Sequence, residues 1–129
     1  MDKETLDTLK EKRRTTDITP SSYPIFTNST FRNAEHTSDE KAAVGGTWKD
    51  FWQIFSQVDF PTVCPFCGKP LEEKDIDGCH INVKGLFGDW LPKKYIIPGH
   101  HDCNMKFGKE CTSRFSVNAV EAIEKDDNE

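Results

Sequence analysis

The chain has 129 residues, of which 35% are hydrophobic and 30% are charged, and its formal net charge is −5. This length predicts one domain with a modest core, and the aromatic content of 11% argues against full disorder. No apolar run has the length of a signal peptide or a membrane span, so we expect an intracellular (cytoplasmic) protein with no membrane partner.

Residues 1–46 are predicted to form an N-terminal extension. Residues 2–14 are polar and helix-forming, which predicts a short helix that needs tertiary support. Residues 15–46 are rich in Ser, Thr, Asn, Pro and Gly, which favours extended or irregular chain. The expected anchors of this stretch on a neighbouring surface are Tyr23, Ile25, Phe26 and Phe31. We expect the extension to attach a protein partner.

The segment TWKDFWQIFSQV, residues 47–58, has the strongest helix pattern in the chain. Thr47 suits the N-cap position, and Asp50 follows three residues later, as in a capping box. Apolar residues recur at helical spacing at Trp48, Phe51, Trp52, Phe55 and Val58. An aromatic stripe of this kind is more often core than a binding face, so we expect this helix to pack against the rest of the domain.

Two cysteines separated by two residues open the segment CPFCGKPL. Two thiolates at this spacing can bind zinc from one tight turn, and the same two-residue gap recurs in HHDC, residues 100–103. In an intracellular protein, a Cys-x-x-Cys among five cysteines favours metal over disulfides. The predicted structural zinc site consists of Cys64, Cys67, His100 and Cys103. The alternatives to His100 as the fourth ligand are His101, Cys79 and Cys111.

Two strands are predicted after the first cysteine pair. One is GCHINVKG, residues 78–85, and the other lies within KKYIIPGHHDCN, residues 93–104. A helix is then expected to begin near Asp102 and to continue through DCNMKFGKECTSRF. Residues 116–129 contain one Lys and five Asp or Glu, which predicts a solvated acidic C-terminal tail.

The order of these motifs over residues 61–115 resembles the HNH-type zinc-binding group, whose core is of the treble-clef-like ββα-metal kind. In that group a Cys-x-x-Cys turn precedes a strand bearing His-Ile, and a Cys-x-x-Cys-Asn segment then leads into a helix. Here CPFC, CHI and YIIPGHHDCN stand in those three places. The resemblance implies an α+β fold in which residues 47–115 form a helix and a small zinc-stapled core, with the N-terminal extension and acidic tail on either side.

The same resemblance implies nuclease chemistry with a divalent ion. By position, His80 would be the general base that activates water, and Asn104 would position or bind a catalytic Mg²⁺ or Mn²⁺. The chain departs from the family at Cys79, where Asp is common, and at Tyr95, where Asn is expected. Cysteine is a soft ligand that suits magnesium poorly. The remaining candidates for an oxygen ligand are Asp77 and Asp89.

Three functions are compatible with these patterns. The chain is an HNH-type nuclease, a zinc-stabilised module that binds nucleic acid or protein without activity, or a structural component of a larger assembly. Residues 61–115 carry eight basic and seven acidic residues, a balance that does not by itself provide the basic surface nucleic acid prefers. His80 discriminates between the functions, because a nuclease needs it beside an open ion site, whereas a buried His80 is structural.

Overall fold

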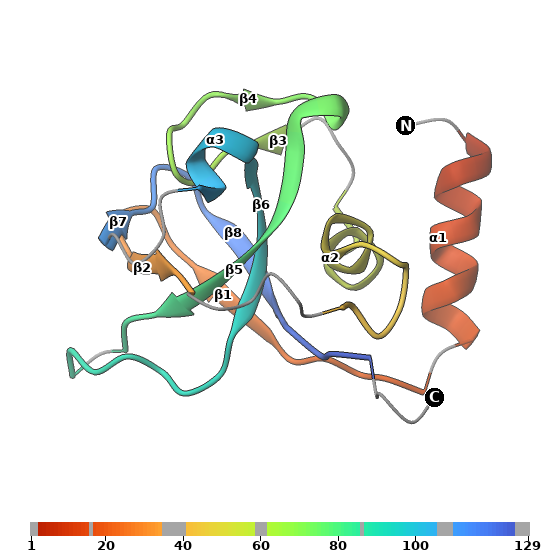
Figure 1. Ribbon diagram of the computed structural model, residues 1–129, viewed down its shortest axis with the longest axis horizontal. Coiled ribbons are helices and arrows are strands. Elements are labelled where there is room, and N and C mark those ends of the chain that lie inside the picture. Colours follow the sequence, from red (N-terminus) through yellow and green to blue (C-terminus); the bar gives the residue numbers. More distant parts are fainter. Residues whose placement is uncertain are drawn as a thin grey trace.

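The computed structural model describes residues 3–15, 17–34, 41–58, 62–85, 87–105 and 110–125. Helices in these ranges are α1 (Lys3–Thr15), α2 (Trp48–Ser56) and α3 (His101–Asn104), with a short 3-10 turn, η1, at Glu73–Asp75. The strands are β1 (Ser22–Ile25), β2 (Thr30–Asn33), β3 (Thr62–Val63), β4 (Pro70–Leu71), β5 (Ile76–Val83), β6 (Tyr95–His100), β7 (Glu110–Thr112) and β8 (Val117–Glu121). In Figure 1, α1 and α2 lie on one side of a curled sheet, and β3, β4 and α3 lie together at one end.

Six strands form one antiparallel sheet in the order β1-β8-β6-β5-β2-β7, and β3 and β4 pair separately. The long hairpin of β5 and β6 lies at the centre of this sheet, with a register that pairs Ile76 with His100 and Ile81 with Tyr95. β8 lies between β1 and β6, and β2 lies between β5 and β7. The edge strands of the sheet are therefore β1 and β7.

The two faces of the central hairpin bury different cores, because successive side chains of a strand point to opposite faces. On the face toward α2, Ile76, Ile96 and Val120 pack with Phe51 and Trp52 of the helix. The opposite face buries a second cluster, made of Ile25, Phe31, Cys79, Ile81, Val83, Tyr95, Ile97 and Ala119. These two faces are called the α2 face and the far face below.

Helix α2 forms as its sequence predicts. The Thr47 hydroxyl accepts a hydrogen bond from the backbone N–H of Asp50 at 3.1 Å, which caps the first turn. Phe51 and Trp52 are fully buried, so the aromatic stripe is core as expected. Gly78 of β5 allows the close approach, because a Cβ there would lie 2.3 Å from the backbone carbonyl carbon of Trp48.

The predicted fold class is wrong. The chain is not a small α+β zinc core of the ββα-metal kind, because β1, β2, β7 and β8 join the β5–β6 hairpin in a mostly antiparallel six-stranded sheet. The expected strands at β5 and β6 are present, but the helix expected after them is only the four-residue α3, and β7 then follows in the same segment. Long-range strand pairing, which local patterns do not encode, decides the architecture.

The flanking regions also differ from the sequence-based prediction. The stretch 15–46 supplies β1 and β2, and the expected acidic tail supplies β8, a strand with a neighbour on each side. Ala119 and Val120 are fully buried, so the beginning of the expected tail belongs to the core. Residues 126–129 lie outside the described part of the chain. None of the helices in the described ranges is long and apolar enough to cross a lipid bilayer.

Candidate metal centre

The first half of the centre is a tight turn between β3 and β4. The backbone N–H of Gly68 donates to the carbonyl of Cys64 at 2.8 Å, and the N–H of Cys64 donates to the carbonyl of Lys69 at 2.9 Å. Gly68 has a φ of 76°, in the left-handed region that glycine adopts at little cost. These bonds close the turn that carries Cys64 and Cys67, residues 64–69, which is called the metal turn below.

The second half lies where β6 ends and α3 begins. His100 is the last residue of β6, and Cys103 lies in the single turn of α3. The carbonyls at the end of so short a helix need partners. The buried Asn33 of β2 supplies one, since its Nδ2 donates to the carbonyl of Cys103 at 3.1 Å and to that of Asn104 at 3.3 Å. Asn33 therefore fixes the position from which Cys103 reaches the first half.

The four predicted ligands meet. The sulfurs of Cys64, Cys67 and Cys103 and a ring nitrogen of His100 all lie within 4.8 Å of one another. Cys64 Sγ is 4.0 Å from Cys103 Sγ, and Cys67 Sγ is 3.3 Å from His100 Nδ1. In a tetrahedral zinc site with zinc–sulfur bonds of about 2.3 Å, two sulfurs are about 3.8 Å apart. The donor set and its spacing therefore fit a zinc ion.

The hydrogen bonding of His100 supports its role as the nitrogen ligand. Its Nε2 lies 3.0 Å from the carbonyl oxygen of Pro70, which can only accept, so Nε2 carries the proton. Nδ1 then presents its lone pair toward Cys67, and a backbone carbonyl on the second ring nitrogen is typical of metal-bound histidine. The alternative ligands His101, Cys79 and Cys111 do not belong to this group of four, the one such group among the described residues.

The electrostatics of the cluster favour a bound cation. Burial first, and then the neighbouring thiols Cys64 and Cys67, raise the pKa of Cys103 to about 12. Burial likewise raises the pKa of Cys64. Burial would also raise the pKa of Cys67, but hydrogen bonds involving Lys69 and His100 help to lower it to about 7. Three thiols this close resist ionising together, and a dication removes that penalty.

His80, the predicted general base, lies on the α2 face of β5. Only 6% of the residue is exposed. Its ring meets the ring of Trp48 edge-on, with the centroids 4.5 Å apart. The side chain therefore fills space between β5 and α2 rather than opening onto solvent. This burial corresponds to the alternative in which His80 has a structural role.

Asn104 lies on the other side of the sheet from His80. Its Nδ2 donates to Asp77 Oδ2 at 3.1 Å, and His101 Nδ1 meets the same oxygen at 2.7 Å. Asp77 and His80 are three residues apart in a regular strand, so their side chains point to opposite faces. The structure therefore brings Asn104 together with Asp77 and His101 but not with His80. The hydrogen bond and charge of Asp77 raise the pKa of the exposed His101.

Two further positions of the expected nuclease motif lie away from His80. Tyr95 is 6% exposed and packs on the far face with its ring 5.5 Å from that of Tyr23. Asp89 is exposed in the loop between β5 and β6, where its carbonyl accepts from the N–H of Gly85 at 2.8 Å. Neither position supplies an oxygen ligand beside His80.

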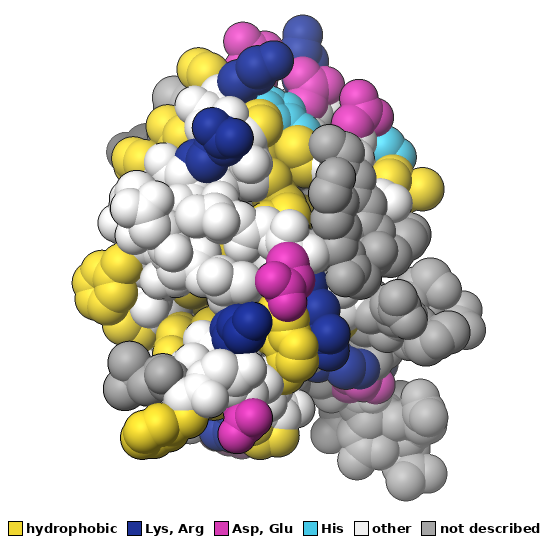
Figure 2. Space-filling model, turned by 90° about the vertical axis from the view of Figure 1, so that its left-hand side faces the viewer, with side chains coloured by type: hydrophobic (Ala, Val, Ile, Leu, Met, Phe, Trp, Pro, Cys, Tyr) yellow, Lys and Arg dark blue, Asp and Glu magenta, His cyan; other side chains and the backbone are white. Residues whose placement is uncertain are grey.

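The surface carries its charges in a mixed pattern. On the face shown in Figure 2, Lys and Arg side chains are interspersed with acidic, polar and hydrophobic ones rather than gathered into one basic area. Several bases are also neutralised locally, since Lys84 Nζ lies 3.6 Å from Glu110 and Lys93 Nζ lies 3.4 Å from Glu121. The pattern agrees with the balanced charge of the sequence.

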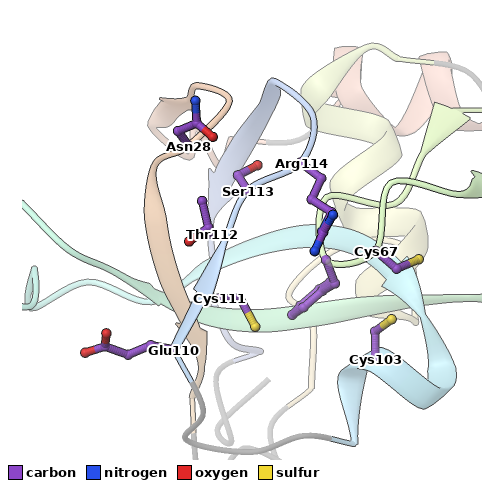
Figure 3. A pocket seen from close by; sticks show the side chains of 9 residues that line it. Asn28, Cys67, Cys103, Glu110, Cys111, Thr112, Ser113 and Arg114 are labelled. Atoms are coloured by element: carbon purple, nitrogen blue, oxygen red, sulfur yellow. The ribbon is translucent and has the colours of Figure 1, made fainter.

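A hollow of about 680 Å³ lies between β7 and the metal cluster, and it is called the β7 groove below. Its lining residues are Asn28, Phe66, Cys67, Cys103, Glu110, Cys111, Thr112, Ser113 and Arg114. In Figure 3, Arg114 extends between Cys111 on one side and Cys67 and Cys103 on the other, and Glu110 points away from them.

Sequence reasoning missed the β7 groove. Cys111 was considered above only as an alternative metal ligand, and it lies half-buried on the wall of the hollow. Arg114 carries no local pattern that marks it, because its place depends on the pairing of β7 with β2. Phe66 could have been predicted to line the site, because it lies between the two cysteines of CPFC and so within the metal turn.

No family model, curated protein or solved structure matches this chain. The resemblance to the HNH-type group therefore stays a prediction from the motif order alone. What the chain can do must be argued from its own residues.

Proposed function

We propose that this chain is a zinc-stabilised binding module in which the metal has a structural role. The observation that carries the proposal is the group of three thiols and one imidazole within 4.8 Å, with the second nitrogen of His100 bonded to a backbone carbonyl. Four protein ligands complete the tetrahedral shell of zinc, so no position is left for a reacting water. Such a site stabilises a fold and supplies no Lewis acid to a substrate.

The geometry supports this function better than nuclease activity. A hydrolytic centre needs the general base, the ion and water in one open space. His80 is buried against Trp48, whereas Asn104 and Asp77 meet on the far face. On the face shown in Figure 2, the described side chains form no basic track for a nucleic-acid backbone, which favours a protein as the partner.

The test of the metal role uses two adjacent histidines as a matched pair. We expect one zinc per chain in the purified protein, measured by elemental analysis. His100→Ala should lose the zinc, and His101→Ala should keep it, because only His100 belongs to the cluster. A protein that carries no zinc, or a His101→Ala variant that alone loses it, would contradict the assignment.

The test against the nuclease function is an assay with Mg²⁺ or Mn²⁺ on DNA and RNA. Wild-type protein and His80→Ala should show the same background. Cleavage by the wild type that disappears in His80→Ala, with zinc content and melting temperature unchanged, would restore the nuclease assignment and overturn the binding module.

A further inference from the structure

The backbone of β7 is open on the side that faces the β7 groove. β7 is an edge strand whose one partner in the sheet is β2. Ser113 uses both its N–H and its carbonyl toward the β1–β2 turn, bonding Ser29 and Asn28 at 2.8 Å each. Because backbone groups alternate along a strand, those of Thr112 and Glu110 point the other way.

The alternation is confirmed one residue further along. The N–H of Arg114 points away from β2 and donates to the carbonyl of Pro65 in the metal turn at 2.8 Å. The metal turn thus closes one end of the open edge. Between that end and Glu110, the outward N–H and carbonyl groups have no strand beside them in the described part of the chain, and the β7 groove lies along them.

Arg114 places a positive charge at the closed end of the groove. Its Cβ and Cδ lie over Gly68, since a Cβ built on that glycine would be 3.5 Å from both. No carboxylate of the described residues forms an ion pair with its guanidinium, whereas Glu110, the acidic residue of the lining, is paired with Lys84. The groove therefore offers one unneutralised cation to a ligand, and guanidinium matches carboxylate geometry best.

Exposed apolar residues neighbour several lining residues of this groove in the sequence. The exposed large hydrophobic residues among the described ones are Phe26, Phe87, Met105 and Phe115. Phe115 follows Arg114, Met105 lies two residues after Cys103, and Phe26 lies two residues before Asn28, so three of the four flank groove residues. Exposed large apolar side chains close in sequence to an open strand edge are consistent with a surface that binds another polypeptide.

We propose that the β7 groove binds an extended peptide segment of a partner protein, which pairs with the open edge of β7 and places one carboxylate on Arg114. This assignment rests on the proposed binding-module function and names its partner class. Strand addition supplies affinity through backbone hydrogen bonds and specificity through adjoining pockets. A volume of about 680 Å³ lies within the range of about 300–1,000 Å³ that ligand sites usually have.

The experiment begins with two random heptapeptide libraries displayed against the zinc-loaded full chain. One library presents free C-termini, and the other presents the same sequences internally. Enriched peptides are then synthesised with free and with amidated C-termini. A C-terminal ligand loses binding on amidation, whereas an internal Asp or Glu ligand loses it when that residue is changed to Asn or Gln. Either result supports a carboxylate on Arg114.

Two substitutions test the contacts. Arg114→Gln should weaken the selected peptides at least tenfold, and Arg14→Gln, at an exposed arginine of α1, should not. Thr112→Pro removes the outward N–H, which an edge strand tolerates, and should also weaken binding at least tenfold. Thr112→Val keeps that N–H and should bind normally. In amide NMR spectra, the resonances of Thr112 and Glu110 should shift when the peptide is added.

The assignment is overturned by libraries that yield no binder, or by binders that ignore both Arg114→Gln and Thr112→Pro. A concentration-dependent dimer of the chain that Thr112→Pro dissolves would also overturn it, because the groove would then hold a second copy. Zinc content and melting temperature are measured for every variant. A wild type that holds one zinc but binds no peptide refutes only the groove, whereas a wild type without zinc refutes the binding module itself.

Discussion

The core beneath α2 and the metal centre stabilise two parts of one β5–β6 hairpin by different means. Beneath α2, Phe51 and Trp52 pack with many aliphatic neighbours. Each side chain contributes to the free energy of unfolding through the apolar area that it removes from water. At the end of the hairpin, the metal turn and the His100–Cys103 segment are held together by four ligand atoms that lie close to one another. The core beneath α2 is stabilised by many small contributions to the folding free energy, and the metal centre by a few large ones.

This difference predicts how the stability of each region should respond to substitution. A core built from many contacts loses stability in proportion to the volume removed. A metal site loses its ion when one ligand is removed, and with the ion goes the free energy that held all four ligands. The following substitutions test whether the two regions differ in this way.

The largest effect is expected at the metal ligands. Cys64→Ser or Cys103→Ser should abolish zinc binding and unfold the metal turn and α3, because structural zinc contributes about 10–16 kcal/mol in small zinc-finger peptides. Elemental analysis and thermal melting measure the outcome. Cys111→Ser is the control, since it removes a thiol outside the cluster and should keep one zinc per chain.

Deletion of residues 120–129 should be nearly as damaging. Truncation of an acidic tail would be harmless, but Val120 is fully buried and pairs with both Ser22 and Ile96. Its loss breaks the sheet between β1 and β6. The deletion should lower the melting temperature by well over ten degrees or prevent folding, and an unchanged melting curve would show that β8 is dispensable.

Trp52→Ala should cost about 3–5 kcal/mol of unfolding free energy, as large-to-small changes in buried cores do. The substitution also removes the bond from Trp52 Nε1 to the carbonyl of Asn118 at 2.8 Å. Urea unfolding measures the loss, and Trp52→Phe should cost less. Zinc content should stay at one per chain, and its loss would show that the two regions are not independent.

His80→Ala should have a smaller effect than Trp52→Ala, about 1–3 kcal/mol, as expected for a buried side chain packed on Trp48. His101→Ala, at a mostly exposed side chain, should change stability by less than about 0.5 kcal/mol. Both variants should retain zinc. Equal stability of His80→Ala and wild type would contradict the packing role.

The metal ligands were predictable because each half of the site is local. A two-residue gap lets both ligands of a pair reach one ion from a single turn, whatever the rest of the chain does, so Cys64 with Cys67 and His100 with Cys103 can be read from sequence. Helix α2 was predictable for the same reason, since its cap and its apolar stripe are local. The same spacing favoured His100 over His101, whereas the contact of His100 Nε2 with the carbonyl of Pro70, thirty positions away, could not be read from sequence.

The sheet was not predictable in the same way. β1 contains Pro24, which a strand pattern tolerates at an edge, and an edge is where β1 lies. β8 is short and is followed by an acidic segment, so its burial depends on partners distant in the chain, among them β1 near the opposite end. The groove shares this limit, because Thr112 and Arg114 acquire their outward backbone groups only from the pairing of β7 with β2.

The position of β8 has a consequence for the order in which the chain folds. The metal turn, the β5–β6 hairpin and α3 involve residues close in sequence, so they can form before the two ends of the chain meet. The pairing of Ser22 with Val120 closes a loop of nearly the whole chain, and such long-range contacts form slowly. We expect refolding chains to pass through a zinc-loaded intermediate in which β6 still has an open edge. During that interval the unpaired strand is exposed to neighbouring polypeptides, and a supply of zinc does nothing to shorten it.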